Sequence, residues 1–175
     1  MKHGWGVLIG IGLIVGCANV WADRGNAVIN GTTEGSPVSG SATLKDTPRG
    51  LKVAVKVAGV PPGRHGLHIH EQGACGDQGK AAGGHFNPAG VPHGFLPKDG
   101  STKAHAGDMG NIEVSRKGSG KATVILPGVS LRGTGGTPSV EGRAIIVHEN
   151  ADDFGQPVGN AGGRIGCGVI MITEK

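Results

Sequence analysis

Hydrophobic and polar residues alternate most regularly in the stretch LKVAVKVA, residues 51–58. Leu51, Val53, Val55 and Val57 share one parity, while lysines and alanines take the other. Because successive side chains of a strand point to opposite faces, this period of two predicts a strand with one buried face. Beyond the N-terminal segment the sequence shows no sustained helical period, so the pattern favours an all-β protein.

Seven further stretches are apolar or alternating and are bounded by glycine, proline or asparagine. They are residues 27–31, 38–44, 66–71, 111–115, 121–126, 143–148 and 168–173. Together with residues 51–58 they predict a single domain built as an eight-stranded Greek-key β-barrel or sandwich. The sequence shows neither an internal repeat nor a second domain.

Residues 71–110 interrupt this pattern, because they predict neither a strand nor a helix over most of their length. Loops longer than about 15 residues are uncommon and are usually functional or disordered. This segment has little aliphatic material for a core, but it contains residue types that bind metals or form cross-links: Cys75, His85, His93, His105 and Asp108. We expect metal ligation and a disulfide to order it.

The N-terminal segment carries a lysine, an apolar run at residues 7–15 and the small-residue site VWA, which ends at Ala22. This pattern predicts a secretion signal over residues 1–22 and a mature domain over residues 23–175. The apolar run is well short of the roughly 20 residues that span a bilayer, so a permanent transmembrane helix is the weaker interpretation.

A second processing route stays open, because IVGC at residues 14–17 resembles the lipobox of bacterial lipoproteins. In that route residues 1–16 are the signal and Cys17 becomes the lipidated first residue. Either route predicts export to the periplasm, as a soluble or a lipid-anchored protein. A membrane partner is expected only if Cys17 is lipidated.

Export changes the expectation for the two remaining cysteines, Cys75 and Cys167. In an oxidising compartment such a pair usually joins, so we predict a disulfide, with two free buried thiols as the alternative. A bridge that closes so long a segment would contribute roughly 4 kcal/mol in the chain-entropy account.

The composition argues against a nucleic-acid partner. Aromatic residues make up 3% of the chain and tyrosine is absent, so there is little on which bases could stack. The formal net charge of +4 is spread along the chain without a basic run. Such a distribution favours a role in solubility over a surface that binds polyanions.

The segment HGLHIHEQGAC, residues 65–75, contains three of the eight histidines. Residues i and i+2 of a strand share a face, so the side chains of His68 and His70 would lie about 7 Å apart and could converge on one ion. A lone His-x-His is more often made of surface or hydrogen-bonded histidines, so other residues must complete a site. His65 has the opposite parity to His68, which favours packing or hydrogen bonding over ligation.

Five motifs follow one another along the chain: GLHIHEQG, GGHFNP, HAGDMGN, VHENADDFG and GNAGGRIGCGVI. From about Ala27 to Thr173 the sequence thereby resembles the copper/zinc superoxide dismutase family, in its bacterial exported type. The resemblance implies an oxidoreductase that uses copper and zinc ions and a Greek-key barrel with long metal-binding and electrostatic loops. Its substrate would be superoxide, a small anion that is converted to dioxygen and hydrogen peroxide.

The resemblance also implies the site residues. Copper would be bound by His68, His70, His85 and His148. Zinc would be bound by His85, His93, His105 and Asp108, so that His85 bridges the ions and, in the family's mechanism, delivers a proton to the forming peroxide. Arg164 would guide the substrate, Asp152 would link the two metal sites, and Cys75 would pair with Cys167. Four imidazoles suit Cu(II), and three imidazoles with a carboxylate suit tetrahedral Zn(II).

The sequence departs from the better-known eukaryotic members in its loops. The stretch from His70 to Cys75 and the loop over residues 149–166 are shorter, and the latter lacks the lysine and acidic pair that steer superoxide there. The oligomeric state therefore stays open, a homodimer included. Lys98 and Lys103, in a longer zinc loop, are either solvated charges or a replacement for part of that field.

Two rival functions deserve comparison. A copper-binding or copper-delivery protein on the same fold would be expected to lack a ligand or the arginine, whereas all seven metal-binding residues and Arg164 are present here. A zinc hydrolase needs an open coordination position, but the zinc ligands implied above fill a tetrahedral shell.

Overall fold

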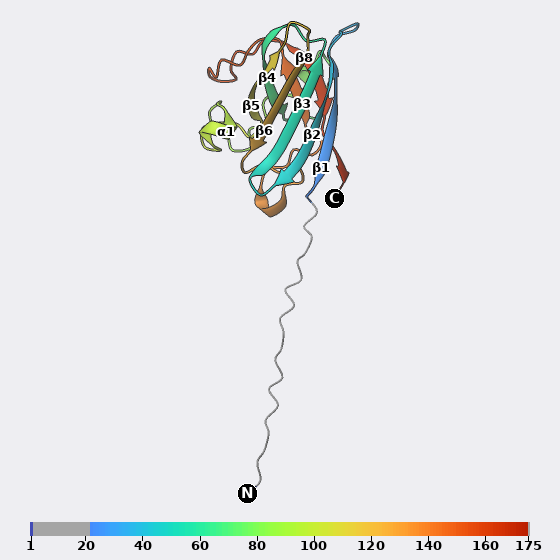
Figure 1. Cartoon of the computed structure of the whole chain (residues 1–175). Helices are drawn as coiled ribbons and strands as arrows, with labels where there is room; N and C mark the ends of the chain where they lie inside the picture. The colour runs from blue at the N-terminus through green and yellow to red at the C-terminus, as the bar shows by residue number, and fades with distance from the viewer. Residues whose placement is uncertain (2–21, 175) are drawn as a thin grey trace.

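The computed structural model describes Met1 and residues 22–174. Cys17 and most of the predicted signal segment lie outside the described residues. The strands are β1 Arg24–Gly31, β2 Ser39–Thr47, β3 Gly50–Ala58, β4 Gly63–His70, β5 Asp108–Val114, β6 Gly120–Leu126, β7 Ala144–His148, β8 Arg164–Val169 and β9 Met171–Glu174 (Figure 1). The helices are short: η1 Lys80–Ala82, α1 Leu96–Asp99 and η2 Thr134–Gly136.

The strands form one antiparallel sheet in the order β2-β3-β6-β5-β4-β7-β8-β1-β9. An additional pairing of β1 with β2 closes strands β1 to β8 into a barrel. The last strand, β9, extends the sheet beside β1. Because β3 pairs with β6 and β4 with β7, the chain crosses between sheet halves in the Greek-key manner. The predicted all-β Greek-key barrel is confirmed.

The last predicted strand, residues 168–173, is wrong in detail. The structure divides it into β8 and β9 at Ile170, which is fully buried and donates its N–H to the Arg143 carbonyl oxygen over 2.8 Å. The β8 strand pairs with β7, whereas β9 pairs with β1. The apolar run is therefore continuous in sequence while its hydrogen-bond partners change.

Alternation along the strands builds an aliphatic core. On β3, Leu51, Val53, Val55 and Val57 point inward and are at most 4% exposed, as their parity predicts. Each such buried side chain contributes roughly 1.5–3 kcal/mol relative to an exposed one.

On β4 the same rule sends Leu67 and Ile69 into the core. His68 and His70, which have the opposite parity, are thereby carried on the outer side of the barrel wall, where loops cover them.

The long segment after β4 is held against the barrel by the predicted disulfide, which is present between Cys75 and Cys167 with 5.7 Å between their Cα atoms. Its backbone is further tied by hydrogen bonds from Glu71 N–H to the Gly84 carbonyl and from Gln72 N–H to the Ala82 carbonyl. The segment also contains η1 and α1, which the sequence did not predict. Across residues 22–174, none of the helices has the length and apolarity needed to cross a bilayer.

Candidate metal centre

Four buried histidines meet on the outer wall of the barrel. His68 and His70 come from β4, and His148 ends the neighbouring strand β7. His85 joins them from the long loop through a β-bridge to His70. One nitrogen from each of the four lies within 4.8 Å of the others, and Nε2 of His70 is 3.3 Å from Nε2 of His148.

A second group shares His85 with the first. Its Nδ1 lies 3.0 Å from Oδ1 of Asp108 and 3.4 Å from Nδ1 of His105. Nδ1 of His93 lies 2.9 Å from Oδ2 of the same carboxylate. Asp108 itself is fixed because its Oδ2 accepts the backbone N–H groups of His105 and Gly94, each over 2.9 Å. Since Nδ1 of His85 faces this group, Nε2 remains for the four-histidine group.

The spacing of these atoms fits metal ligation. Metal–nitrogen bonds of 2.0–2.1 Å in a tetrahedral site place neighbouring ligand atoms about 3.3–3.4 Å apart. The pairs His70–His148 and His85–His105 have this separation.

Two buried nitrogens supply a second test of the fit. Nδ1 of His68 has no hydrogen-bond partner among the described residues, and Nδ1 of His93 contacts only Oδ2 of Asp108, a member of its own group. A buried polar atom without a partner costs free energy, and a bound cation would satisfy each of them. The residues present therefore fit copper and zinc.

Asp152 connects the two groups from behind. Its carboxylate accepts a hydrogen bond from Nε2 of His68 over 2.8 Å and another from Nε2 of His93 over 3.0 Å. With a proton of each ring held at Nε2, Nδ1 of each ring is the nitrogen directed into its metal group. The Phe154 N–H donates to the same carboxylate over 2.8 Å, and Asp152 is 1% exposed.

Burial keeps three of the four histidines of the first group neutral. Burial lowers the pKa of His70 to about 2, of His148 to about 3 and of His85 to about 4. Neutral imidazole is the form that binds metals, so these rings are ready to ligate at neutral pH.

His93 and the two carboxylates titrate in the opposite sense. Burial lowers the pKa of His93, but its contacts with Asp108 and Asp152 outweigh burial and raise that pKa to about 9. Burial raises the pKa of Asp108, but hydrogen bonds with His105, His85 and His93 hold it well below the usual range. The pKa of Asp152 is likewise low, because the bonds from His68 and His93 outweigh its burial. Without metal, the second group thus carries its negative charge beside a protonated His93.

Arg164 is fixed next to the first group. Its Nη1 donates to the Gly79 carbonyl and its Nη2 to the Gly83 carbonyl, both over 2.6 Å. The Gly83 carbonyl also lies 3.0 Å from Nδ1 of His70, so one oxygen ties the guanidinium to a histidine of the site. The arginine charge helps to lower the pKa of His70 and of His148, which places it within electrostatic reach.

Within residues 22–174 Arg164 forms no ion pair with Asp152 or Asp153, the acidic residues of the neighbouring loop. Asp152 is occupied by the histidines, and Asp153 accepts hydrogen bonds from Asn160 and Gly155.

His65 lies outside both groups. Its two ring nitrogens contact the carbonyl oxygens of His148 and Pro61, over 2.9 and 2.8 Å. The hydrogen-bonding role inferred from its parity thus agrees with its position. Lys98 and Lys103 are exposed, and within the described chain neither ammonium group contacts a residue of the two groups.

Sequence reasoning missed the side chains that hold the loops together. The Asn111 amide exchanges hydrogen bonds of 2.9 and 2.8 Å with the Asp152 backbone, and Gln156 does the same with the His93 backbone over 2.8 and 3.0 Å. Gly159 has a φ of 76°, and a Cβ there would overlap Oδ1 of Asp152 and lie 2.6 Å from Nε2 of His93. Amides and glycines are common in loops, so no sequence signal singled these out.

Comparison with known proteins gives a consistent result. Residues 38–170 match the family described as copper/zinc superoxide dismutase. A Cu-Zn superoxide dismutase of Caulobacter vibrioides is 39% identical over 138 residues, which is 75% of this chain and 78% of that protein. An extracellular Cu-Zn superoxide dismutase of Haemonchus contortus is 39% identical over 167 residues, or 90% of this chain and 88% of that protein. The crystal structure of the clock protein EA4 superposes with a TM-score of 0.75 at 32% identity, covering 99% of this chain and 100% of the other.

Proposed function

The chain belongs to the copper/zinc superoxide dismutase family, and we propose that the two ligand groups on its outer wall are the metal centre of this enzyme. It is an oxidoreductase whose cofactors are copper and zinc. The copper ligands are His68, His70, His85 and His148. The zinc ligands are His85, His93, His105 and Asp108.

The observation that carries this assignment is the sharing of His85. Its Nδ1 lies among donors of the kind that bind zinc, one of which is a carboxylate. The other side of the ring faces three further imidazoles, and the ring centroids of His85 and His68 are 4.0 Å apart. An all-imidazole set suits copper, and the set with the carboxylate suits zinc. A histidine in both groups supports one mixed centre over two separate sites.

Copper, when bound, supplies one-electron redox chemistry in which one superoxide loses an electron and a second gains it, while zinc supplies charge and no redox step. The protein's own residues bind the ions, orient the ligand rings and hold the proton that the product needs. Asp152 fixes the tautomers of His68 and His93, and Gly83 fixes that of His70. We expect Nε2 of His85 to hold the proton that the forming peroxide takes up.

Arg164 recruits the substrate in this proposal. Superoxide is small and has few handles, so charge and channel width must supply most of its recognition. A guanidinium held by two backbone carbonyls is preorganised, and a fixed cation near the reacting centre raises the encounter rate. Its anchors, Gly79 and Gly83, lie in the loop that the disulfide from Cys75 holds in place.

A copper-delivery protein on the same fold is not favoured. Such a carrier has no need for a buried carboxylate that links two metal groups or for a fixed cation beside them. Both features are present in this chain, in Asp152 and Arg164.

We also propose export, because relatives of this chain include an extracellular enzyme and a bacterial one. The mature domain then covers residues 23–175, or begins at a lipidated Cys17, in the periplasm. Intact-mass measurement separates the two routes, since a diacylated Cys17 start is much heavier than an Asp23 start. Association into a homodimer remains a proposal for sedimentation analysis.

Three matched variants test the metal assignments. His85→Ala should lower both copper and zinc content, His70→Ala should lower copper, and His93→Ala should lower zinc. Elemental analysis of each purified variant measures both metals. If His85→Ala lowered only one metal, His85 would be no bridge and the two groups would be independent sites.

A further inference from the structure

The outward positions of four neighbouring strands form a face that carries positive charge and no carboxylate. Figure 1 shows β6, β3, β2 and β1 side by side across the front of the barrel. The register places Arg24, Lys45, Lys52 and Ile125 in one row across β1, β2, β3 and β6. A parallel row further along the same strands contains Val28 and Lys121. We call the outward-facing positions of the four strands between and including these two rows the basic face.

The row at the other end of the basic face repeats this arrangement. It consists of Val28, Ser41, Lys56 and Lys121 in the same strand order. The row between the two contains Asn26, Thr43, Ala54 and Thr123. Its residues are uncharged, so the basic face holds five basic side chains and no acidic one on these four strands. Arg24 is paired in the register with Glu174 of β9, so the proposal below rests on the four lysines.

The lysines of the basic face stand directly opposite like charges. Lys45 pairs with Lys52, and Lys56 pairs with Lys121. Paired Cα atoms of antiparallel strands are about 4.5–5.5 Å apart, and like charges in that position are destabilising. Across residues 22–174 the ammonium groups of these four lysines make no hydrogen bond or ion pair. The fold therefore carries uncompensated repulsion that an external anion would relieve.

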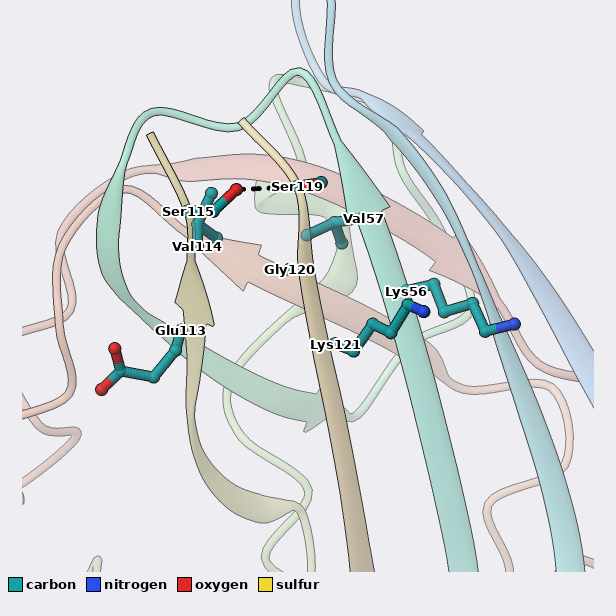
Figure 2. Close-up of a pocket in the computed structure, with 8 residues that line it drawn as sticks. All are labelled: Lys56, Val57, Glu113, Val114, Ser115, Ser119, Gly120 and Lys121. Atoms are coloured by element: carbon teal, nitrogen blue, oxygen red, sulfur yellow. Dashed lines mark hydrogen bonds between the residues drawn. The ribbon is translucent and has the colours of Figure 1, made fainter. Parts of the chain in front are cut away.

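The far end of the basic face is visible in Figure 2. A shallow hollow of about 460 Å³ is lined by Lys56, Lys121, Glu113 and residues of the β5–β6 turn. The two lysine side chains extend away from Glu113, whose carboxylate points to the opposite side and pairs with Arg64 over 3.7 Å. The carboxylate that lines this hollow thus leaves Lys56 and Lys121 available.

Exposed apolar side chains border the same face. Val28 is 66% exposed within the last row, and Met171 of β9 is 59% exposed and lies opposite Asn26 in the register. The positive charges are spread in two dimensions over four strands. This arrangement fits the flat array of lipid headgroups at a bilayer surface better than the single line of charges along a polyanion. Binding at a membrane interface combines lysine–headgroup attraction with insertion of such apolar groups.

The chain also enters the sheet at this face, because β1 begins at Arg24 in the first row. If Cys17 carries lipid, only six residues separate the anchor from Arg24, and they reach at most about 25 Å. That route would hold the basic face close to the bilayer. We propose that the basic face docks the protein on a membrane surface rich in anionic phospholipid.

Vesicle co-sedimentation of the exported Cys17→Ala protein tests the proposal, because acyl chains on Cys17 would insert into both kinds of vesicle whatever their charge. The probes are vesicles of phosphatidylcholine alone and vesicles with about 30% phosphatidylglycerol. The protein should bind the anionic vesicles and lose most of this binding as salt is raised. Changing Lys45, Lys52, Lys56 and Lys121 together to Gln should weaken binding by up to about 600-fold, since each lysine near such a surface is worth roughly fivefold.

A charge-matched control separates the face from the net charge. It changes three exposed lysines elsewhere, Lys80, Lys98 and Lys103, to Gln, and it is compared with a face variant that loses the same charge through Lys45, Lys52 and Lys56 to Gln. This control should bind anionic vesicles within about twofold of the original protein. Equal loss in both variants, undiminished binding of the face variant, or no binding of the original protein would each overturn the proposal. Binding to a sulfated polysaccharide without binding to vesicles would also overturn it, because the partner would then be a polymer.

Discussion

Asp152→Asn is the substitution that tests the link between the two metal groups most sharply. The carboxylate accepts a hydrogen bond from His68 Nε2 at 2.8 Å and from His93 Nε2 at 3.0 Å. The amide of asparagine has the same shape but only one oxygen, so its NH2 group must face one of the two rings. That ring then has to accept at Nε2 and carry its proton at Nδ1, which is the nitrogen that must bind metal.

The size of the effect follows from these two bonds. A hydrogen bond to a charged group contributes about 1.5–3 kcal/mol, which corresponds to roughly 10- to 150-fold in affinity at either site. Loss of a hydrogen-bond partner behind a metal ligand typically costs about 10- to 100-fold, which is a consistent range. We therefore expect the affinity for copper, for zinc or for both to fall by at least about tenfold.

Competition against chelators of known affinity measures this change for each metal. Asp153→Asn is the matched control, because Asp153 is exposed and bonds only to residues of its own loop. The reasoning would be refuted if Asp152→Asn bound both metals as tightly as the Asp153→Asn control.

Reducing the bond between Cys75 and Cys167, which are 92 residues apart, should remove about 4 kcal/mol and lower Tm by about 10 °C, and an unchanged calorimetric Tm would contradict this. Arg164→Glu should cut the second-order rate constant with superoxide about tenfold or more and flatten its salt dependence, without changing metal content. Arg164→Lys should keep most of the rate, and a wild-type rate for Arg164→Glu would exclude steering. Since the pKa of His93 is raised to about 9 without metal, zinc binding at pH 7.5 should release about one proton, which calorimetry in different buffers detects. The release should fall to about half a proton near pH 9 and decline further above it, and zero release at pH 7.5 would be the contrary result. The metal-free protein should lose stability as pH falls below about 6.5. The folded pKa values of His70, His148 and His85 are lowered to about 2, 3 and 4, so the folded protein takes up fewer protons there than the unfolded chain. A Tm that stays flat between pH 6.5 and 4 would speak against this.

Local patterns predicted much of this fold. The alternation of residues 51–58 predicted the buried face of β3, because side-chain parity is a property of the strand itself. Parity also placed His68 and His70 on one side, and their ring centroids are 6.4 Å apart. The disulfide followed from the cysteine count and the predicted compartment.

Features that depend on register between distant strands could not be predicted in this way. The charge looked evenly spread along the chain, yet pairing of β2 with β3 and of β3 with β6 gathers Lys45, Lys52, Lys56 and Lys121 on one surface. The division between β8 and β9 likewise depends on a change of partner strand. Asn111 and Gln156 act on backbones far away in sequence, so their roles appear only once the loops are folded.

The central claim is that this chain is a superoxide dismutase whose copper and zinc share one histidine. Metal content and superoxide-dismutating activity, measured on the same purified mature protein, test it most directly. We predict one copper and one zinc per chain, with rapid dismutation that depends on copper. A protein that holds copper at this site with its zinc in place but does not accelerate superoxide decay would contradict the account and favour a copper carrier.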